Sequence, residues 1–119
     1  MSADPYSGRV RELFANPQHA GTVVGGVTVR VDDQGVRVEL SASIESGRIS
    51  AMRFRAWGCP HLIAAAEQAC SLYEDGPVAA LEIFEREQIM EDLTVPAEKT
   101  GRILVLEDAV QSLGRDLRH

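Results

Sequence analysis

The sequence is poor in the side chains that bind metals through sulfur or imidazole. Its 119 residues include two cysteines, Cys59 and Cys70, and three histidines, His19, His61 and His119. No Cys-x-x-Cys pair is present to suggest a zinc or redox site. If one helix carries both cysteines, their separation along it is roughly 16 Å, at a rise of about 1.5 Å per residue. The two thiols are therefore too far apart to share one metal.

Positive charge and long apolar stretches are also scarce. The net charge is −6 at pH 7 and the isoelectric point is about 5.0, which argues against nucleic-acid binding because phosphates require a concentrated positive surface. No apolar run approaches the roughly 18 residues of a membrane-spanning helix. The N-terminus lacks the basic stretch and apolar core of a signal peptide, so we expect a cytoplasmic protein without membrane contact. No catalytic triad, phosphate loop or pair of catalytic carboxylates stands out, so we expect no enzyme activity.

Length and composition fit one domain spanning residues 1–119. Apolar residues make up 45% of the chain and charged residues 25%, a balance that supports a packed core. Residues 4–15 predict a short amphipathic helix that Asp4 caps, with Pro5 in its first position. Asn16-Pro17 ends this helix, because the residue before a proline avoids the helical region. Its apolar residues recur at helical spacing: Tyr6, Val10, Leu13 and Phe14.

From residue 27 onward the apolar period changes to two, which predicts β-strands. We expect strands at residues 27–31, 36–44 and 48–57, joined by turns at residues 32–35 and 45–47. Short turns between successive strands predict an antiparallel meander with one apolar face.

The third strand contains an irregularity in its apolar pattern. Met52, Phe54 and Ala56 are in phase with one another, whereas Ile49 is not. We therefore expect a bulge or a change of facing near Ala51.

Four helices are expected after the strands. The first three occupy residues 61–73, 78–85 and 88–92, and residues 94–100 form the loop that leads into the last one. The apolar residues of that last helix step by three and four: Ile103, Leu106, Val110, Leu113 and Leu117. We therefore predict an α+β fold in which an N-terminal helix and a three-stranded antiparallel meander precede about four helices packed on one face of the sheet.

Cys59 is the main candidate for chemistry. It lies between Gly58 and Pro60 at the junction of a strand and a helix, at or beside the N-cap. Unpaired N–H groups and the positive end of the helix dipole favour a thiolate there. A thiolate can bind a metal or accept sulfur. The alternative is a small, partly buried cap residue with no chemical role.

Three further residues are weaker candidates. His61 could turn back toward Cys59 as a second metal ligand, although a first-turn histidine is more often a surface residue. Cys70 is expected to be a buried, inert thiol. His19 lies in a loop before the sheet, and the sequence leaves open whether folding brings it near Cys59.

Three groups of residues, in this order along nearly the whole chain, point to one protein family. They are Tyr6…Val10…Phe14-x-Asn16-Pro17-x-x-x-Gly21, then Gly47-x-Ile49…Phe54…Trp57-Gly58-Cys59 before an alanine-rich helix, then Pro96-x-x-Lys99…Glu107-Asp108-Ala109. With them the chain resembles the IscU/NifU-type iron–sulfur cluster scaffold proteins. The resemblance implies the IscU/NifU-like fold, a role in iron–sulfur cluster assembly, and cysteine desulfurase or another assembly protein as a partner.

The resemblance also implies a set of cluster ligands that this chain mostly lacks. Cys59 matches one of the family's cysteines. Another, with an aspartate two residues later, would lie at Gln34-Gly35-Val36, and a His-Cys pair would precede the last helix at Gly101-Arg102. The family's Leu-Pro-Pro-Val-Lys segment, which binds a chaperone, corresponds at best to residues 94–99, which contain one proline.

These differences leave two hypotheses. A two-iron cluster takes about four thiolate or imidazole ligands, and Arg102 puts a fixed positive charge where a thiolate belongs. Arg102 could instead bind an anion, or support a thiolate or persulfide on Cys59. The first hypothesis is a degenerate, non-enzymatic scaffold that handles iron, zinc, a shared cluster or sulfur through Cys59, with His61 as a candidate second ligand. The second is a metal-free adaptor or regulator that keeps the scaffold shape in order to dock cysteine desulfurase or another assembly partner.

Overall fold

The computed structural model describes residues 6–118 and contains a three-stranded sheet. Strands β1 (Val27–Asp33), β2 (Val36–Glu45) and β3 (Arg48–Trp57) are antiparallel neighbours in sequence order. Both connections are two-residue turns, in which Gln34 and Ser46 have φ of 52° and 54° and the glycines after them 73° and 76°. Two successive residues with a left-handed backbone conformation match the right-handed twist of the strands that they join. The predicted meander is confirmed.

The bulge predicted in β3 is also present. The register against β2 shifts so that Ser43 faces Ala51 while Ile44 faces Ile49. Ser50 is therefore the extra residue, and it returns Ile49 to the inner face of the sheet, where Ile49 is fully buried. Ile44, which the alternation predicts to be buried, is 45% exposed beside the bulge.

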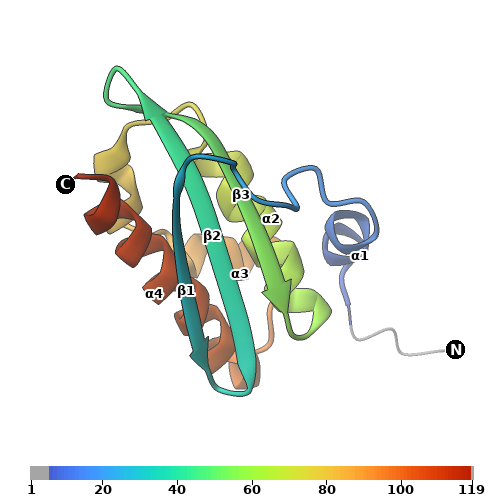
Figure 1. Cartoon of the computed structure of the whole chain (residues 1–119). Helices are drawn as coiled ribbons and strands as arrows, with labels where there is room; N and C mark the ends of the chain where they lie inside the picture. Colours follow the sequence, from blue (N-terminus) through green and yellow to red (C-terminus); the bar gives the residue numbers. More distant parts are fainter. Residues whose placement is uncertain (1–5, 119) are drawn as a thin grey trace, which may run out of the picture.

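Helices cover one face of the sheet (Figure 1). Helix α2 (Pro60–Tyr73) packs on β3, and α4 (Thr100–Leu117) packs on β1 and β2. The shorter α3 (Arg86–Leu93) contacts both of these helices. The 3₁₀ turns η1 (Val78–Glu82) and η2 (Ala97–Lys99) lie on either side of α3 along the chain. The α+β fold is confirmed.

The segment expected to be a helix at residues 78–85 is only a 3₁₀ turn. Its buried residues are Val78, Leu81 and Phe84, each three positions after the last, whereas Ile83 is 71% exposed. A spacing of three matches a 3₁₀ turn, which has three residues per turn and seldom runs long. The apolar pattern thus correctly indicates a helical segment, but its period is not that of an α-helix.

Helix α1 (Gly8–Ala15) lies outside the edge of the sheet, packed against α2 (Figure 1). Its N-cap is Ser7 rather than Asp4. The Ser7 hydroxyl accepts a hydrogen bond from the Val10 N–H at 3.2 Å and donates one to the Leu93 carbonyl at 3.0 Å. One side chain thus both caps α1 and joins it to α3. Asp4 and Pro5 lie outside the described residues.

The core lies between the sheet and helices α2 and α4. Val38, Leu40 and Ala42 point into it from alternate positions of β2, and all three are fully buried. The five apolar residues that predict the last helix are all buried on α4. Within residues 6–118, no helix combines the length and apolar character needed to cross a membrane.

Candidate functional site

Three segments meet at one end of the sheet: the β1–β2 turn, the end of β3 and the start of α4 (Figure 1). A Cβ atom placed on Gly58 would lie 2.9 Å from Cγ1 of Val36, and one placed on Gly101 would lie 3.3 Å from Oε1 of Gln34. The structure therefore brings together the three places at which the resemblance expects cluster ligands.

Cys59 is the N-cap of α2, as the sequence predicts. Its backbone is extended, and its carbonyl accepts hydrogen bonds from the N–H groups of Leu62 at 3.0 Å and Ile63 at 3.2 Å. Pro60 follows in the first turn, where the missing N–H costs nothing. The thiol makes no capping hydrogen bond and is partly buried against the core. The side chain is thus placed where the free N–H groups of a helix start can interact with an anion.

His61 is buried, contrary to the expectation of a surface residue. Its side chain contacts the ring of Tyr6 with 4.8 Å between centroids, and only 1% of the residue is exposed. Neither ring nitrogen has a hydrogen-bond partner within the described chain. Burial, followed by the positive charges of Lys99 and Arg102, lowers the pKa of His61. The imidazole is therefore held neutral.

Cys59 and His61 do not form a metal centre with other residues. His61 is enclosed in the core, whereas Cys59 is only partly buried. Among residues 6–118, no three side chains of His, Cys, Asp or Glu gather in a way that could hold a metal ion.

Arg102 lies inside α4 rather than before it. The helix begins at Thr100, so Gly101 and Arg102 occupy its first turn, which corrects the expectation that this position precedes the helix. Arg102 forms no hydrogen bond or ion pair with any described residue, and its charge acts on His61. The position at which the family's His-Cys pair is expected thus presents an unpaired guanidinium.

Cys70 is the buried thiol that the sequence predicts. It is fully buried within α2. Burial, together with the negative charges of Glu67 and Glu74, raises its pKa far above the usual range of a thiol. Cys70 is therefore unsuited to nucleophilic or metal chemistry.

His19 belongs to a separate polar cluster that extends from Glu67 in α2 to Glu74 at its C-cap. Its ring Nδ1 lies 2.5 Å from Glu67 and its Nε2 lies 3.3 Å from Glu74, while its backbone N–H donates to Glu67 at 2.7 Å. Glu74 also accepts hydrogen bonds from the Met52 N–H at 2.9 Å and from Arg53 at 2.6 Å. His19 is thus tied to later turns of the helix that Cys59 begins. Glu67, an acidic residue on an otherwise apolar stripe of α2, is the sequence signal for this cluster.

Glu74 should make the stability of the protein depend on pH. Burial opposes its ionisation, but the hydrogen bonds from Met52 and Arg53 and the charges of Arg53 and His19 together lower its pKa below 4.5. The stabilisation is therefore present above about pH 4.5 and is lost as the pH falls through the lowered pKa. We expect Glu74→Gln to cost about 1–3 kcal/mol at pH 7, and the difference from wild type to shrink in acid, measured by urea unfolding across this range. Glu12→Gln, at an exposed position, is the control, and a Glu74→Gln deficit that does not change with pH would contradict this account.

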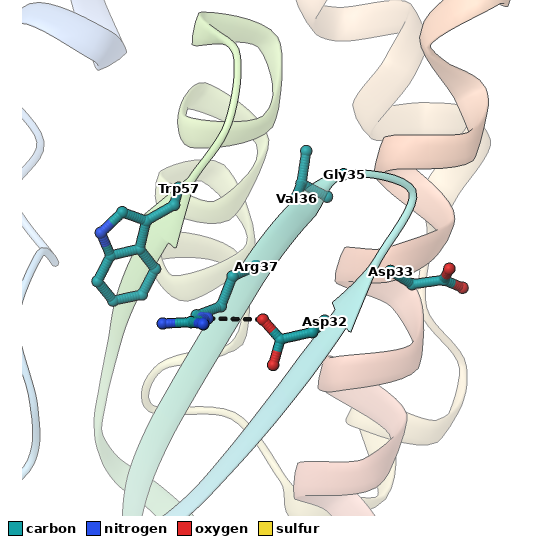
Figure 2. Close-up of a pocket in the computed structure, with 6 residues that line it drawn as sticks. All are labelled: Asp32, Asp33, Gly35, Val36, Arg37 and Trp57. Carbon is teal, nitrogen blue, oxygen red and sulfur yellow. Dashed lines mark hydrogen bonds and ion pairs between the residues drawn. The ribbon is translucent and has the colours of Figure 1, made fainter.

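A surface cleft of about 490 Å³ lies on the outer side of this end of the sheet (Figure 2). Arg37 and Asp32 form an ion pair of 2.6 Å across it, and the Arg37 guanidinium lies over the ring of Trp57 at 5.4 Å. The hydrogen bond from Arg37 lowers the pKa of Asp32. Asp33 points away from this pair. Arg37 and Asp32 thus neutralise each other beside Gln34-Gly35-Val36, the position at which the resemblance expects a cysteine and an aspartate.

Comparisons with known proteins find a matching family model and similar sequences. Residues 5–113 match the family model described as the NifU-like N terminal domain. The iron–sulfur cluster assembly scaffold protein IscU of Azotobacter vinelandii is 27% identical, over 96% of this chain and 94% of its own length. The mitochondrial iron sulfur cluster assembly protein 1 of Debaryomyces hansenii is 25% identical, over 95% of this chain and 68% of its own length.

Solved structures of similar proteins share the fold. The N-terminal part of a NifU-like protein from Brucella abortus aligns with a TM-score of 0.75 at 15% identity, covering 94% of this chain and 93% of that one. A crystal structure from Fervidobacterium islandicum AW-1, described as an iron–sulfur cluster assembly scaffold protein for the SUF system, aligns with a TM-score of 0.74 at 13% identity. The alignment covers 90% of this chain and 94% of that one. At these identities the likeness establishes the architecture alone.

Proposed function

This chain belongs to the family of NifU-like N-terminal domains, and on that basis we propose that it is a non-enzymatic, scaffold-like protein of iron–sulfur cluster assembly. The family match and the scaffold relatives that align over almost the whole chain support this role. We propose further that its handling of metal or sulfur is limited to Cys59. A cytoplasmic location stays a prediction, and the two unpaired cysteines are consistent with a reducing compartment.

The observation that carries the proposal is one thiol at the meeting point of three segments. A two-iron cluster takes about four thiolate or imidazole ligands. At this end of the sheet the chain offers Cys59, while Gln34 and Arg102 occupy the neighbouring segments. A guanidinium repels iron cations and stays charged at every accessible pH. A cluster could therefore be cargo here only if a second subunit or another protein supplied the missing ligands.

Sulfur transfer is the chemistry that one thiol can perform. The Cys59 thiolate would attack the outer sulfur of a persulfide on a partner cysteine desulfurase. A sulfur–sulfur bond forms on Cys59 as the bond to the desulfurase cysteine breaks, and that cysteine leaves as a thiolate, so no oxidant is required. The free N–H groups at the start of α2 would stabilise the negative charge on Cys59 before and after the transfer.

The alternative function is a metal-free adaptor that docks a desulfurase or another assembly partner without accepting cargo. It is favoured by Arg102, which has no partner among residues 6–118, and by the enclosure of His61 in the core away from solvent. In this case the retained fold supplies the docking surface, and Cys59 is only a cap residue.

Anaerobic reconstitution with ferrous iron and sulfide distinguishes the two functions. We expect the monomeric wild-type chain to gain no stoichiometric cluster, and any visible absorbance to appear on an oligomer that shares cargo. That absorbance should be lost in Cys59→Ser and kept in the matched control Cys70→Ala, because Cys70 is enclosed in the core.

Four outcomes are informative. Absorbance that depends on Cys59 supports the scaffold, and a gain of one sulfur atom on Cys59 after incubation with a desulfurase and cysteine supports sulfur transfer. A colourless protein that binds the desulfurase equally well with and without Cys59 supports the adaptor. A stable cluster bound stoichiometrically by the monomer would contradict both.

A further inference from the structure

An apolar groove of about 550 Å³ lies between the end of α1 and the edge of β3. Phe14 and Pro17 line it from the α1 side, Trp57 from the end of β3, and Ile63 from α2. Phe14 is 45% exposed and Trp57 44% exposed. Two half-exposed aromatic side chains at one groove are typical of a surface that binds another protein.

The edge of β3 is open at this groove. At Phe54 the edge is covered, because the Phe54 N–H donates to the His19 carbonyl at 2.9 Å and the Phe54 carbonyl accepts from Gly21 at 2.8 Å. Alternate residues of a strand direct their backbone groups to the same edge, so Ala56 presents its N–H and carbonyl next to this covered position. Ala56 lines the groove, and within residues 6–118 nothing pairs with its outward backbone groups. An open edge of this kind can accept one more extended segment.

The rim of the groove carries a positive charge without a carboxylate partner. The exposed Arg55 lies over the ring of Trp57 at 5.1 Å. Glu39 faces Arg55 in the β2–β3 register, yet no ion pair joins them, and Arg55 pairs with no other described residue. The neighbouring Arg37 and Arg53 are already paired, with Asp32 and Glu74. In a chain of net charge −6, Arg55 is thus available to an acidic group.

We propose that this groove binds an extended segment of a partner protein in which apolar and acidic residues alternate. Such a segment would pair with the backbone of Ala56 as a short added strand. Alternate side chains of a strand point to opposite faces, so an apolar side chain would enter between Phe14 and Ile63 while the next, a carboxylate, would reach Arg55. The proposal concerns recognition and does not depend on whether Cys59 binds metal or sulfur.

A selection from random nonapeptides displayed on phage, against the whole metal-free chain, tests this assignment. The selected peptides should alternate apolar residues with Asp or Glu. When synthesised, they should change the emission of Trp57, which is the single tryptophan of the chain. Methylating the backbone nitrogen that faces Ala56 should weaken binding, because it removes the donor of an added strand.

Charge reversal supplies the matched comparison. Arg55→Glu should weaken acidic peptides by about tenfold or more and select basic peptides instead. Arg115→Glu, an identical change of charge on the exposed end of α4, should have no effect. Trp57 emission and unfolding by urea confirm that each variant is folded.

Three results would overturn the assignment. The first is a selection in which wild-type protein enriches no more peptide than the Arg55→Glu variant does. The second is a set of selected peptides without acidic residues. The third is peptide binding whose affinity Arg55→Glu leaves unchanged. If sedimentation shows a dimer that Arg55→Glu dissociates, the groove binds a second copy of this chain instead of a partner protein. Because no metal or sulfur is used, a negative result here is separate from failure of the reconstitution.

Discussion

Cys59 should react with iodoacetamide in the native protein roughly a hundred times faster than Cys70, or more. Cys59 caps α2 at a partly exposed position, whereas Cys70 is fully buried and its pKa is raised by burial and by Glu67 and Glu74. A buried thiol reacts only when the structure around it opens. Quenching at successive times, followed by mass analysis of the peptides, gives both rates.

Unfolded protein provides the control for this experiment. In concentrated urea the two thiols should react at similar rates, because the difference comes from the fold. The single-thiol variants Cys59→Ser and Cys70→Ala identify which peptide carries each rate. Equal native rates, or a faster Cys70, would mean that the start of α2 does not present its thiol to solvent as described.

Leu106→Ala should lower the free energy of unfolding by about 2–5 kcal/mol, the usual cost of emptying a buried leucine site. Leu106 is fully buried on α4, the helix that packs on β1 and β2. Its removal leaves a cavity between the two layers that hold the fold together. Urea unfolding at pH 7 measures the change.

Leu104→Ala is the matched control on the same helix. Leu104 is 40% exposed, so the same truncation should cost much less there, about 1 kcal/mol or below. A loss below about 1 kcal/mol for Leu106→Ala would mean that α4 is not docked on the sheet through this side chain.

The strands and the last helix could be predicted because their patterns are local. The alternation of apolar residues and the turns at Gln34-Gly35 and Ser46-Gly47 specify the meander. The break in this alternation at Ile49 correctly indicates the bulge. The start of α1 could not be predicted in this way. Ser7 caps it with the help of a hydrogen bond to Leu93, a residue distant in sequence.

The candidate site could be predicted only in part. The sequence identifies Cys59 as an N-cap thiol, because glycine and proline flank it at the end of a strand. The burial of His61 cannot be predicted from neighbouring residues, because it involves Tyr6 from another segment. The pairing of His19 with Glu67 and Glu74 likewise requires a loop and a helix to meet. A single sequence contains no direct signal for such contacts.

The sequence by itself determined the order of the elements, the shortage of thiols and the position of the thiol that starts a helix, since each follows from neighbouring residues and from composition. The tertiary structure decided which segments meet around that thiol. It also enclosed the His61 ring without a hydrogen-bond partner among residues 6–118, and it left Arg55 and the β3 edge at Ala56 open. These features depend on contacts between residues far apart along the chain, and such contacts form only when the helices pack on the sheet.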